Sequence, residues 1–323
     1  METKEIVRTR GGAFLLLETQ AENVFTPEDF SEEQQMMRDA VKEFIDREVW
    51  PNKHRFEQKD YDFTFELMRK AGELGFLGVG VPEAYGGLEM GFVSTMLVCD
   101  YFSGATGSLS TAYGAHTGIG IMPIVLYGTE EQKQKYVPKL ASGEEIGCYC
   151  LTEPGAGSDA NSGKTKAVLS EDGTHYKISG QKIWISNAGY ASVMIVFARI
   201  EDDKNITGFI VPNDPENGIS MGEEEHKLGI HASSTRQVFF SETKVPVENM
   251  LSERGNGFKI AMNALNVGRI KLAVACIDAQ RRTVSESVRY ANERIQFKPP
   301  ISQFGAIKQK IANMATNCYA GES

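Results

Sequence analysis

The spacing of apolar residues divides the chain into three blocks. From about residue 27 to 145, apolar positions recur every three or four residues, which is the period of an amphipathic helix. From about 146 to 246 the pattern changes to short runs of β-branched and aromatic residues separated by glycine-containing turns. From about 247 the helical period returns. This order predicts a multi-domain α+β protein with a central β domain between two helical domains.

Local signals place several helix ends in the first block. Ser31-Glu32-Glu33-Gln34 and Thr129-Glu130-Glu131-Gln132 have the form of capping boxes, so we expect a helix to follow each. Thr64 is expected to open a further helix, and Gly75 to terminate it. These signals support a helical domain over residues 27–145, preceded by an N-terminal segment over residues 1–26.

The second block contains several short segments with strand-like composition. Asp172-Gly173 and Ser179-Gly180 mark turns between some of them. Many short strands joined by turns predict an antiparallel barrel or sandwich over residues 146–246. The expected strands are Lys164–Leu169, His175–Ser179, Lys182–Ser186, Val193–Arg199, Thr207–Val211 and Gln237–Phe240.

The third block reads as one long helix from Gly257 to about Arg294, interrupted by Pro299-Pro300. A further helix is expected from near Phe304. The sequence ends at Ser323 within this second pattern, without a capping signal. We therefore expect residues 247–323 to be the start of a truncated C-terminal helical domain.

Composition narrows the function classes. The chain has 323 residues, 41% hydrophobic and 24% charged, with a net charge of −9. An acidic chain of this kind lacks the broad basic face that nucleic-acid binding requires. No apolar run approaches the roughly 20 residues of a membrane span, and the N-terminus lacks the shape of a secretory signal. A cytoplasmic location is expected, with the mitochondrial matrix less favoured.

The cysteines favour reduced, intracellular thiols, because they are odd in number and scattered. Cys148 and Cys150 share one face of an expected strand and are interpreted as small buried hydrophobic residues. Neither cysteine nor histidine spacing indicates a metal site. The five cysteines are Cys99, Cys148, Cys150, Cys276 and Cys318.

Two motifs in the β block carry the most specific signal. Tyr149-Cys150-Leu151-Thr152-Glu153-Pro154-Gly155-Ala156-Gly157-Ser158-Asp159 leads from an apolar strand into a turn where backbone N–H groups and small hydroxyls lie close to a ligand. Gln181-Lys182-Ile183-Trp184-Ile185-Ser186-Asn187 follows as a second strand with an aromatic and a hydroxyl. A lone threonine or tryptophan usually just packs in a strand or core. The two motifs together, in a β block between helical blocks, resemble the flavin-binding segments of the acyl-CoA dehydrogenases.

The resemblance implies FAD as cofactor and a role for each motif residue. Thr152 would bond the pyrimidine edge of the flavin ring, Trp184 would pack against the ring, and Ser186 would hydrogen-bond near the nitrogen that accepts a hydride. Ser158 would reach a phosphate or the CoA arm. The implied cofactor-binding residues of these motifs are Tyr149, Leu151, Thr152, Ser158, Trp184, Ile185 and Ser186.

The same resemblance implies a fatty acyl-CoA substrate. Asn266 and Arg269 fall early in the long helix, where family members carry an arginine near the active centre. Ser110 and Gly114 are four residues apart on an expected helix, so they share a face. Larger side chains close the acyl pocket at the matching positions of medium-chain enzymes. Small residues here favour the long-chain or very-long-chain branch, although small residues for helix packing explain the pair equally well.

A second subunit is implied as well. The segment Glu293–Phe297 resembles one that reaches the FAD of a neighbouring subunit, so Arg294, Gln296 and Phe304 would contact that cofactor. Lys298 departs from the family, which usually has glycine there. The resemblance thus implies a homodimer or homotetramer, with an electron-transfer flavoprotein as the electron acceptor.

The general base is the missing part. Most family members carry it in a Glu-Gly-Thr motif that would lie beyond Ser323, and a minority carry it where this chain has Gly268. Glu153 is a poor candidate because its turn position suggests solvation. We therefore expect residues 1–323 alone to be inactive. Two alternatives stay open: an oxidase or monooxygenase on the same fold, and a non-catalytic fragment that binds flavin or acyl-CoA.

Overall fold

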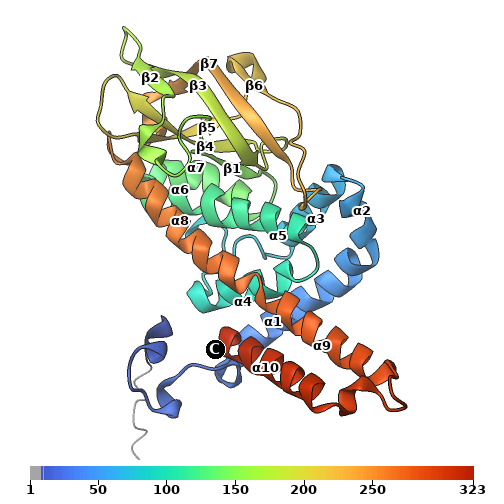
Figure 1. The fold of residues 1–323 in the computed structure, drawn as a ribbon. Coiled ribbons are helices and arrows are strands. Elements are labelled where there is room, and N and C mark those ends of the chain that lie inside the picture. Colours follow the sequence, from blue (N-terminus) through green and yellow to red (C-terminus); the bar gives the residue numbers. More distant parts are fainter. Residues whose placement is uncertain (1–8, 10) are drawn as a thin grey trace, which may run out of the picture.

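The computed structural model describes residue 9 and residues 11–323. Figure 1 shows the β domain at one end, a layer of helices against it, and a hairpin of two long helices at the other end. Residues 1–8 and 10 of the expected N-terminal segment lie outside the described residues. The helices are α1 (Glu32–Phe44), α2 (Lys53–Glu57), α3 (Tyr61–Glu73), α4 (Gly91–Ser103), α5 (Gly107–Gly114), α6 (Met122–Tyr127), α7 (Glu130–Ala141), α8 (Gly257–Val274), α9 (Ile277–Glu293) and α10 (Gly305–Glu322).

Both predicted capping boxes form, at Ser31 before α1 and at Thr129 before α7. The prediction that Thr64 opens a helix was wrong, because Asp60 caps α3 and accepts the Phe63 N–H at 3.0 Å. Thr64 instead lies inside the helix, where its buried hydroxyl donates to the Ala232 carbonyl at 3.0 Å. Gly75 follows the end of α3 with a φ of +80°, as its predicted role requires.

The β domain is a single mixed sheet with the order β6-β7-β3-β2-β4-β5-β8, and β1 also pairs with β4. Most ladders are antiparallel, as predicted, but β1 and β2 both run parallel to β4. Two predicted strands, on either side of Gly180, join into the single strand β3. The strands are β1 (Gly147–Cys150), β2 (Lys166–Leu169), β3 (His175–Ser186), β4 (Val193–Ile200), β5 (Thr207–Pro212), β6 (Ile219–Met221), β7 (Thr235–Pro246) and β8 (Met250–Leu251).

The side chains of β4 point alternately to the two faces of the sheet, and both faces are packed. Met194 and Val196 enter a core made by the strands and the turn between β3 and β4, together with Cys148 and Cys150. Residues between them, such as Ile195, face helices α6, α7 and α8 in a second core. Figure 1 shows these helices lying against one face of the sheet. The junction between the sheet and these helices therefore contains a buried apolar core.

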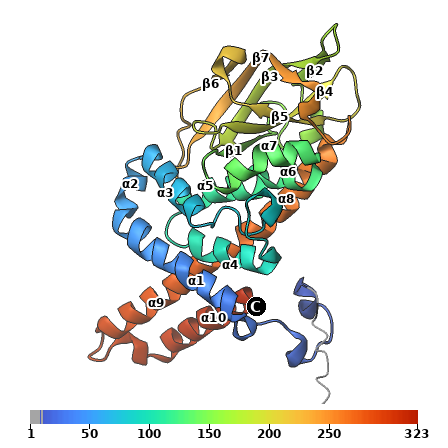
Figure 2. The ribbon, with the colours of Figure 1, turned by 180° about the vertical axis from the view of Figure 1, so that it is seen from behind.

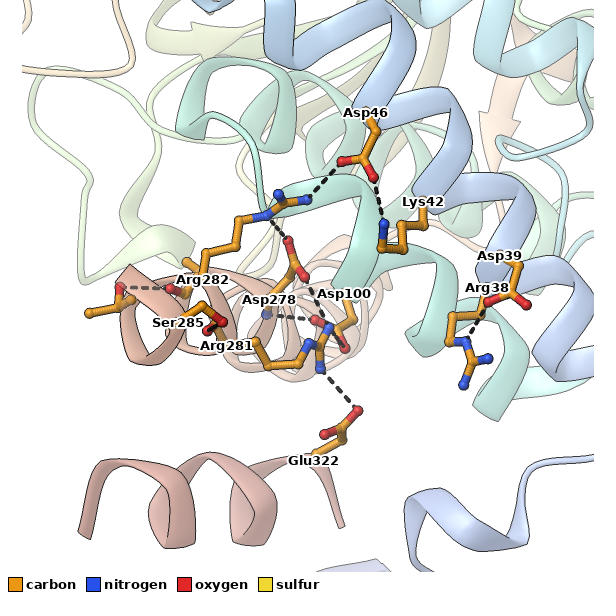
Figure 3. A network of polar contacts seen from close by, with 12 residues as sticks. Arg38, Asp39, Lys42, Asp46, Asp100, Asp278, Arg281, Arg282, Ser285 and Glu322 are labelled. Carbon is orange, nitrogen blue, oxygen red and sulfur yellow. Dashed lines mark hydrogen bonds and ion pairs between the residues drawn. The ribbon is translucent and has the colours of Figure 1, made fainter. Parts of the chain in front are cut away.

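The predicted continuous helix from Gly257 to Arg294 is divided into α8 and α9 at Ala275 and Cys276. Asp100 of α4 accepts the Asp278 N–H at 2.8 Å and thereby holds the start of α9. Arg281 extends the contact, with hydrogen bonds to Asp100 and to Glu322 of α10 (Figure 3). This break depends on a residue almost 180 positions away, so the local pattern could not reveal it.

The helical run Gly257–Glu293 contains a stretch that could cross a membrane, judged only by its length and composition. The sequence expectation that no segment meets this test was wrong for this run. A single such helix is weak evidence, because core helices of soluble proteins pass the same test. The α8 part contacts α4, α5, α6 and β5, so it has a packing role within the fold.

Candidate functional site

Both flavin-like motifs line one cavity between the sheet and α8, which we call the strand-side cavity. It encloses about 360 Å³. The end of β1 and its turn form one wall, the end of β3 another, and α8 a third. The lining residues are Ala115, Ile119, Tyr149, Leu151, Thr152, Gly157, Ser158, Ala160, Trp184, Ile185, Ser186, Met262, Leu265 and Arg269. All seven motif residues predicted to bind a cofactor are therefore brought together.

A β-bulge near the end of β3 shapes this wall. The pairing of β3 with β7 shifts register between Lys182 and Ile185, and Trp184 adopts a φ of +57°. A regular strand would turn alternate side chains to opposite faces, but here Trp184, Ile185 and Ser186 all border the cavity. Trp184 is 64% exposed. Its indole is thus available to a ligand instead of being used as core, and a strained backbone of this kind is typical of functional sites.

A buried ion pair supports the turn that follows β1. The Lys182 ammonium lies 2.7 Å from the Glu153 carboxylate, which also accepts the N–H groups of Lys164 and Thr165. Burial raises the pKa of Glu153, but Lys182 and the N–H donors outweigh burial and lower it below its ordinary value. Glu153 was expected to be solvated, and that was wrong because it is buried. It remains unsuited to act as a base, because its oxygens are occupied.

A second cavity, the helix-side cavity, opens between α4, α5 and α8 and encloses about 370 Å³. It shares Ala115, Ile119, Ser186, Leu265 and Arg269 with the strand-side cavity, so the two meet at a common wall. Its other lining residues are Cys99, Ser110, Thr111, Gly114, Gly268, Lys271, Leu272 and Ala275. Ser110 and Gly114 therefore lie where the sequence placed them, on one face of a helix beside a cavity.

Asn187 fixes the geometry between the two cavities, a role that sequence reasoning missed. Its side chain is fully buried, and its amide donates to the Ala112 carbonyl of α5 at 2.9 Å. Its backbone N–H donates to Ser234 at 2.8 Å, and its φ is +66°. Asparagine tolerates this left-handed conformation better than most residues. The sequence shows an asparagine directly after Ser186, but it could not show that this side chain bonds to α5.

Asn266 and Arg269 lie one turn apart on the exposed side of α8. The Asn266 side-chain oxygen accepts a hydrogen bond from Arg269 at 2.6 Å. Arg269 borders both cavities, whereas Asn266 borders neither of them. Arg269 thus lies at the wall shared by the two cavities, and Asn266 is connected to that wall through Arg269.

Arg294, Gln296 and Phe304 lie at the far tip of the α9–α10 hairpin and line neither cavity. Figures 1 and 2 show this hairpin extending away from the β domain. Within one chain the structure does not bring these residues to the other site residues. Lys298, where the family usually has glycine, adopts a φ of +84° in the connecting turn. The turn therefore forms in spite of the departure, in a conformation that glycine would favour.

The wall shared by the two cavities carries the Ser186 hydroxyl and the Arg269 guanidinium, the strand-side cavity adds the exposed Trp184 indole, and the helix-side cavity is mainly apolar. Within residues 11–323, no Asp or Glu lines either cavity, and no group of three or more His, Cys, Asp or Glu is arranged to hold a metal ion. The arrangement suits a planar ligand with a polar edge next to an aliphatic one. Proton removal by a carboxylate is not provided for by the residues described.

Three consecutive domains of one protein family match this chain. Residues 31–144 match the N-terminal domain of acyl-CoA dehydrogenase, residues 148–243 the middle domain, and residues 255–323 the C-terminal domain. An acyl-CoA dehydrogenase of Bacillus subtilis is 39% identical over 90% of this chain and 76% of its own length. The chain belongs to the acyl-CoA dehydrogenase family. This membership confirms the predicted fold, with a β domain between two helical domains.

Other members of the acyl-CoA dehydrogenase family match more closely but are longer. A "Probable acyl-CoA dehydrogenase" of B. subtilis is 48% identical over 97% of this chain and 52% of its own length. An acyl-CoA dehydrogenase from Bacillus anthracis, crystallised in complex with FAD, has a TM-score of 0.91 and 48% identity, covering 97% of this chain and 53% of that one. The chain thus spans about half the length of these relatives.

The family relatives do not single out one substrate length. The bovine mitochondrial short-chain specific acyl-CoA dehydrogenase is 35% identical over 90% of this chain and 71% of its own length. The very long-chain specific enzyme of Macaca fascicularis is 39% identical over 87% of this chain and 45% of its own length. The predicted long-chain branch therefore rests on the cavity residues and not on overall similarity.

Proposed function

We propose that the strand-side cavity binds FAD and that the helix-side cavity receives the acyl chain of a fatty acyl-CoA. The whole protein would then catalyse α,β-dehydrogenation of the thioester in fatty-acid β-oxidation. The observation that carries this proposal is the common wall, where Ser186 and Arg269 border both cavities. A ligand in one cavity is there in contact with a ligand in the other. Such contact is what a transfer between cofactor and substrate requires.

The strand-side residues fit an isoalloxazine ring. The exposed Trp184 offers an aromatic face, and Tyr149 and Leu151 form an apolar wall. The hydroxyls of Thr152 and Ser186 can form hydrogen bonds with the edge of the ring. Ile185 completes the wall from β3, and Ser158 lies exposed on the turn, where it would meet a phosphate or the CoA arm. Bound FAD would supply the acceptor for the β hydride. This chain's residues would orient the ring and exclude water from its inner face.

The helix-side cavity fits an extended aliphatic chain. A Cβ atom built on Gly114 would meet no atom within 4 Å, so the wall is open at this position. Ser110 leaves similar room one turn earlier. We infer a long or very long acyl chain, with Arg269 near the thioester end and Asn266 holding Arg269 through their hydrogen bond.

The remaining parts of the proposal concern groups outside these cavities. We propose that the general base is not among residues 1–323, that Arg294, Gln296 and Phe304 contact FAD of a second subunit in a homodimer or homotetramer, and that an electron-transfer flavoprotein accepts the electrons. We also propose domain bounds of 27–145, 146–246 and 247–323, and a cytoplasmic location. The absence of a cavity carboxylate in the described residues supports the first point. It equally favours the alternative of a non-catalytic flavin- or acyl-CoA-binding fragment.

An anaerobic titration tests the proposal. The chain is purified with added FAD, palmitoyl-CoA is added, and the flavin absorbance is followed. Bound flavin that shifts its spectrum but stays oxidised is the expected result, because the pocket is present and the base is not. Bleaching would show that a base lies within residues 1–323, and no flavin binding would refute the assignment of the strand-side cavity. Mixing chemically reduced protein with oxygen then separates a dehydrogenase from the oxidase alternative, which reoxidises rapidly.

A further inference from the structure

Lys271 is a buried cation with no anionic partner among the residues that the structure describes. It lies on α8 and is only 4% exposed. Its ammonium donates to the Thr117 hydroxyl at 3.0 Å, and that hydroxyl donates in turn to the Tyr113 carbonyl at 2.9 Å. No carboxylate of the described residues pairs with it, and the Tyr113 ring centroid is 5.8 Å away. An ammonium has three donors, so two of them remain available to a ligand.

Burial of such a group is costly. Burial lowers the pKa of Lys271 to about 8, which leaves the ammonium mostly charged near neutral pH. An unpaired buried charge destabilises a protein unless a counter-charge or hydrogen-bond acceptors reach it. An anion that enters from solvent would satisfy both donors and remove this cost.

A third cavity adjoins Lys271, and we call it the Lys271 cavity. It encloses about 300 Å³ among α4, α5, α6, α8 and the segment 76–81. Its wall is mainly apolar, with Phe76, Phe92, Leu126 and Val267 among the lining residues. Thr117 also lines it, so the Lys271–Thr117 pair forms a polar part of the wall of a mainly apolar chamber.

We propose that the Lys271 cavity is a second ligand site, distinct from the two cavities of the proposed function, and that it binds an aliphatic monocarboxylate such as a free fatty acid. The carboxylate would accept the two remaining N–H donors of the Lys271 ammonium, and the hydrocarbon tail would lie along Phe76, Leu126 and Val267. A charged donor paired with an apolar chamber matches this amphiphile in both parts. Phosphates and nucleotides fit poorly, because two N–H donors of one ammonium cannot replace the hydration of a phosphate group.

Isothermal titration of the chain with decanoate tests the site, with decanol and decyltrimethylammonium as probes of matched length. We expect saturable binding of one decanoate per chain, and binding at least 10-fold weaker for the other two probes, because a hydrogen bond to a charged group is lost. This comparison uses the unaltered chain and does not depend on any variant folding. Equal binding of decanoate and decanol, or no saturable binding, would overturn the proposal.

Four variants locate the ligand. Lys271→Met should weaken decanoate binding about 10-fold or more, while Lys259→Met, which removes an exposed lysine of the same helix, should leave it unchanged. Lys271 also borders the helix-side cavity, so two filling variants are compared. Val267→Phe should abolish decanoate binding and Gly114→Leu should not. The reverse pattern would place decanoate in the helix-side cavity and refute the second site, whatever the outcome of the FAD titration.

Discussion

The Lys182 ammonium and the Glu153 carboxylate form an ion pair that connects three strands beneath the flavin-like motifs. Lys182 also donates to the Leu151 carbonyl at 3.2 Å and to the Phe197 carbonyl at 2.7 Å. Its strand neighbour Ile183 donates a backbone hydrogen bond to Thr152 at 3.0 Å. The turn after β1 and the bulged end of β3 are therefore held in one fixed relation, and the strand-side cavity lies between them.

Breaking this ion pair should destabilise the β domain strongly. Lys182→Met leaves the Glu153 carboxylate buried and unpaired, which costs about 3–5 kcal/mol in comparable sites. Glu153→Gln together with Lys182→Met should cost less than the sum of the single changes, because no uncompensated charge remains. Urea unfolding measures the free energies, and Lys166→Met, at an exposed lysine of β2, is the control. Additive costs would show that the pair is not coupled.

The buried side chain of His116 should make the stability of the protein depend on pH. It is fully buried, its Nδ1 accepts the Gly147 N–H at 3.0 Å, and its Nε2–H donates to the Leu140 carbonyl at 2.9 Å. Burial lowers the pKa of His116 to about 4, from an ordinary value of 6.5. The folded state thus binds fewer protons than the unfolded state between these values, so its stability is complete above pH 6.5 and falls as the pH drops towards 4.

The expected loss from His116 is about 2–3 kcal/mol between pH 7 and pH 4.5, at 1.36 kcal/mol per pKa unit. Urea unfolding across this range should show the slope in the native chain. The His116→Gln variant has no titrating group at this position. Its free energy of unfolding should therefore fall by about 2–3 kcal/mol less than that of the native chain over the same pH range. Parallel pH profiles for the two proteins would exclude His116 as the cause.

The motifs could be found from the sequence because their residues are close together along the chain. Tyr149, Thr152, Trp184 and Ser186 all line one cavity, although β1 pairs with β4 and β3 pairs with β2 and β7. The bulge that exposes Trp184 could not be predicted, because it arises from the register of β3 against β7. The sequence pattern indicates the period of a strand. The register, however, depends on which strand it pairs with, and that pairing is set by the whole fold.

Contacts between residues far apart in the chain could not be predicted from the sequence either. Asn187 bonds to Ala112, and Asp100 to the backbone of Asp278, across 75 and 178 positions respectively. Glu153 was expected to be solvated because of its turn position, whereas the structure buries it against Lys182 on another strand. The same limit applies to Lys271, whose surroundings come from three helices and one loop segment. Buried polar groups are thus the least predictable part of this site, since each needs a partner supplied by tertiary structure.

The turn between α9 and α10 offers a stabilising substitution. Lys298 has a φ of +84°, in the left-handed region that costs a non-glycine residue about 1–2 kcal/mol. Lys298→Gly removes this strain and adds some entropy to the unfolded chain, so we expect a net gain of about 0.5–1 kcal/mol. Thermal unfolding measures the gain. Lys308→Gly, within α10, should instead destabilise the protein by about 1 kcal/mol, and a loss at both positions would show that Lys298 is not strained.

The length of the bound acyl chain should depend on Gly114. Because a side chain at this position would enter open space beside the helix-side cavity, Gly114→Glu should displace the distal carbons of a long substrate without reaching its thioester end. Each buried methylene contributes about 0.8 kcal/mol, so exclusion of two or more should weaken palmitoyl-CoA binding about 10-fold or more. Butyryl-CoA, which ends before the obstruction, serves as the control within the same variant. Spectral titration of the FAD-loaded chain gives both affinities. Equal weakening of the two ligands would indicate a general distortion of α5, and unchanged palmitoyl-CoA affinity would show that the acyl chain follows a different path.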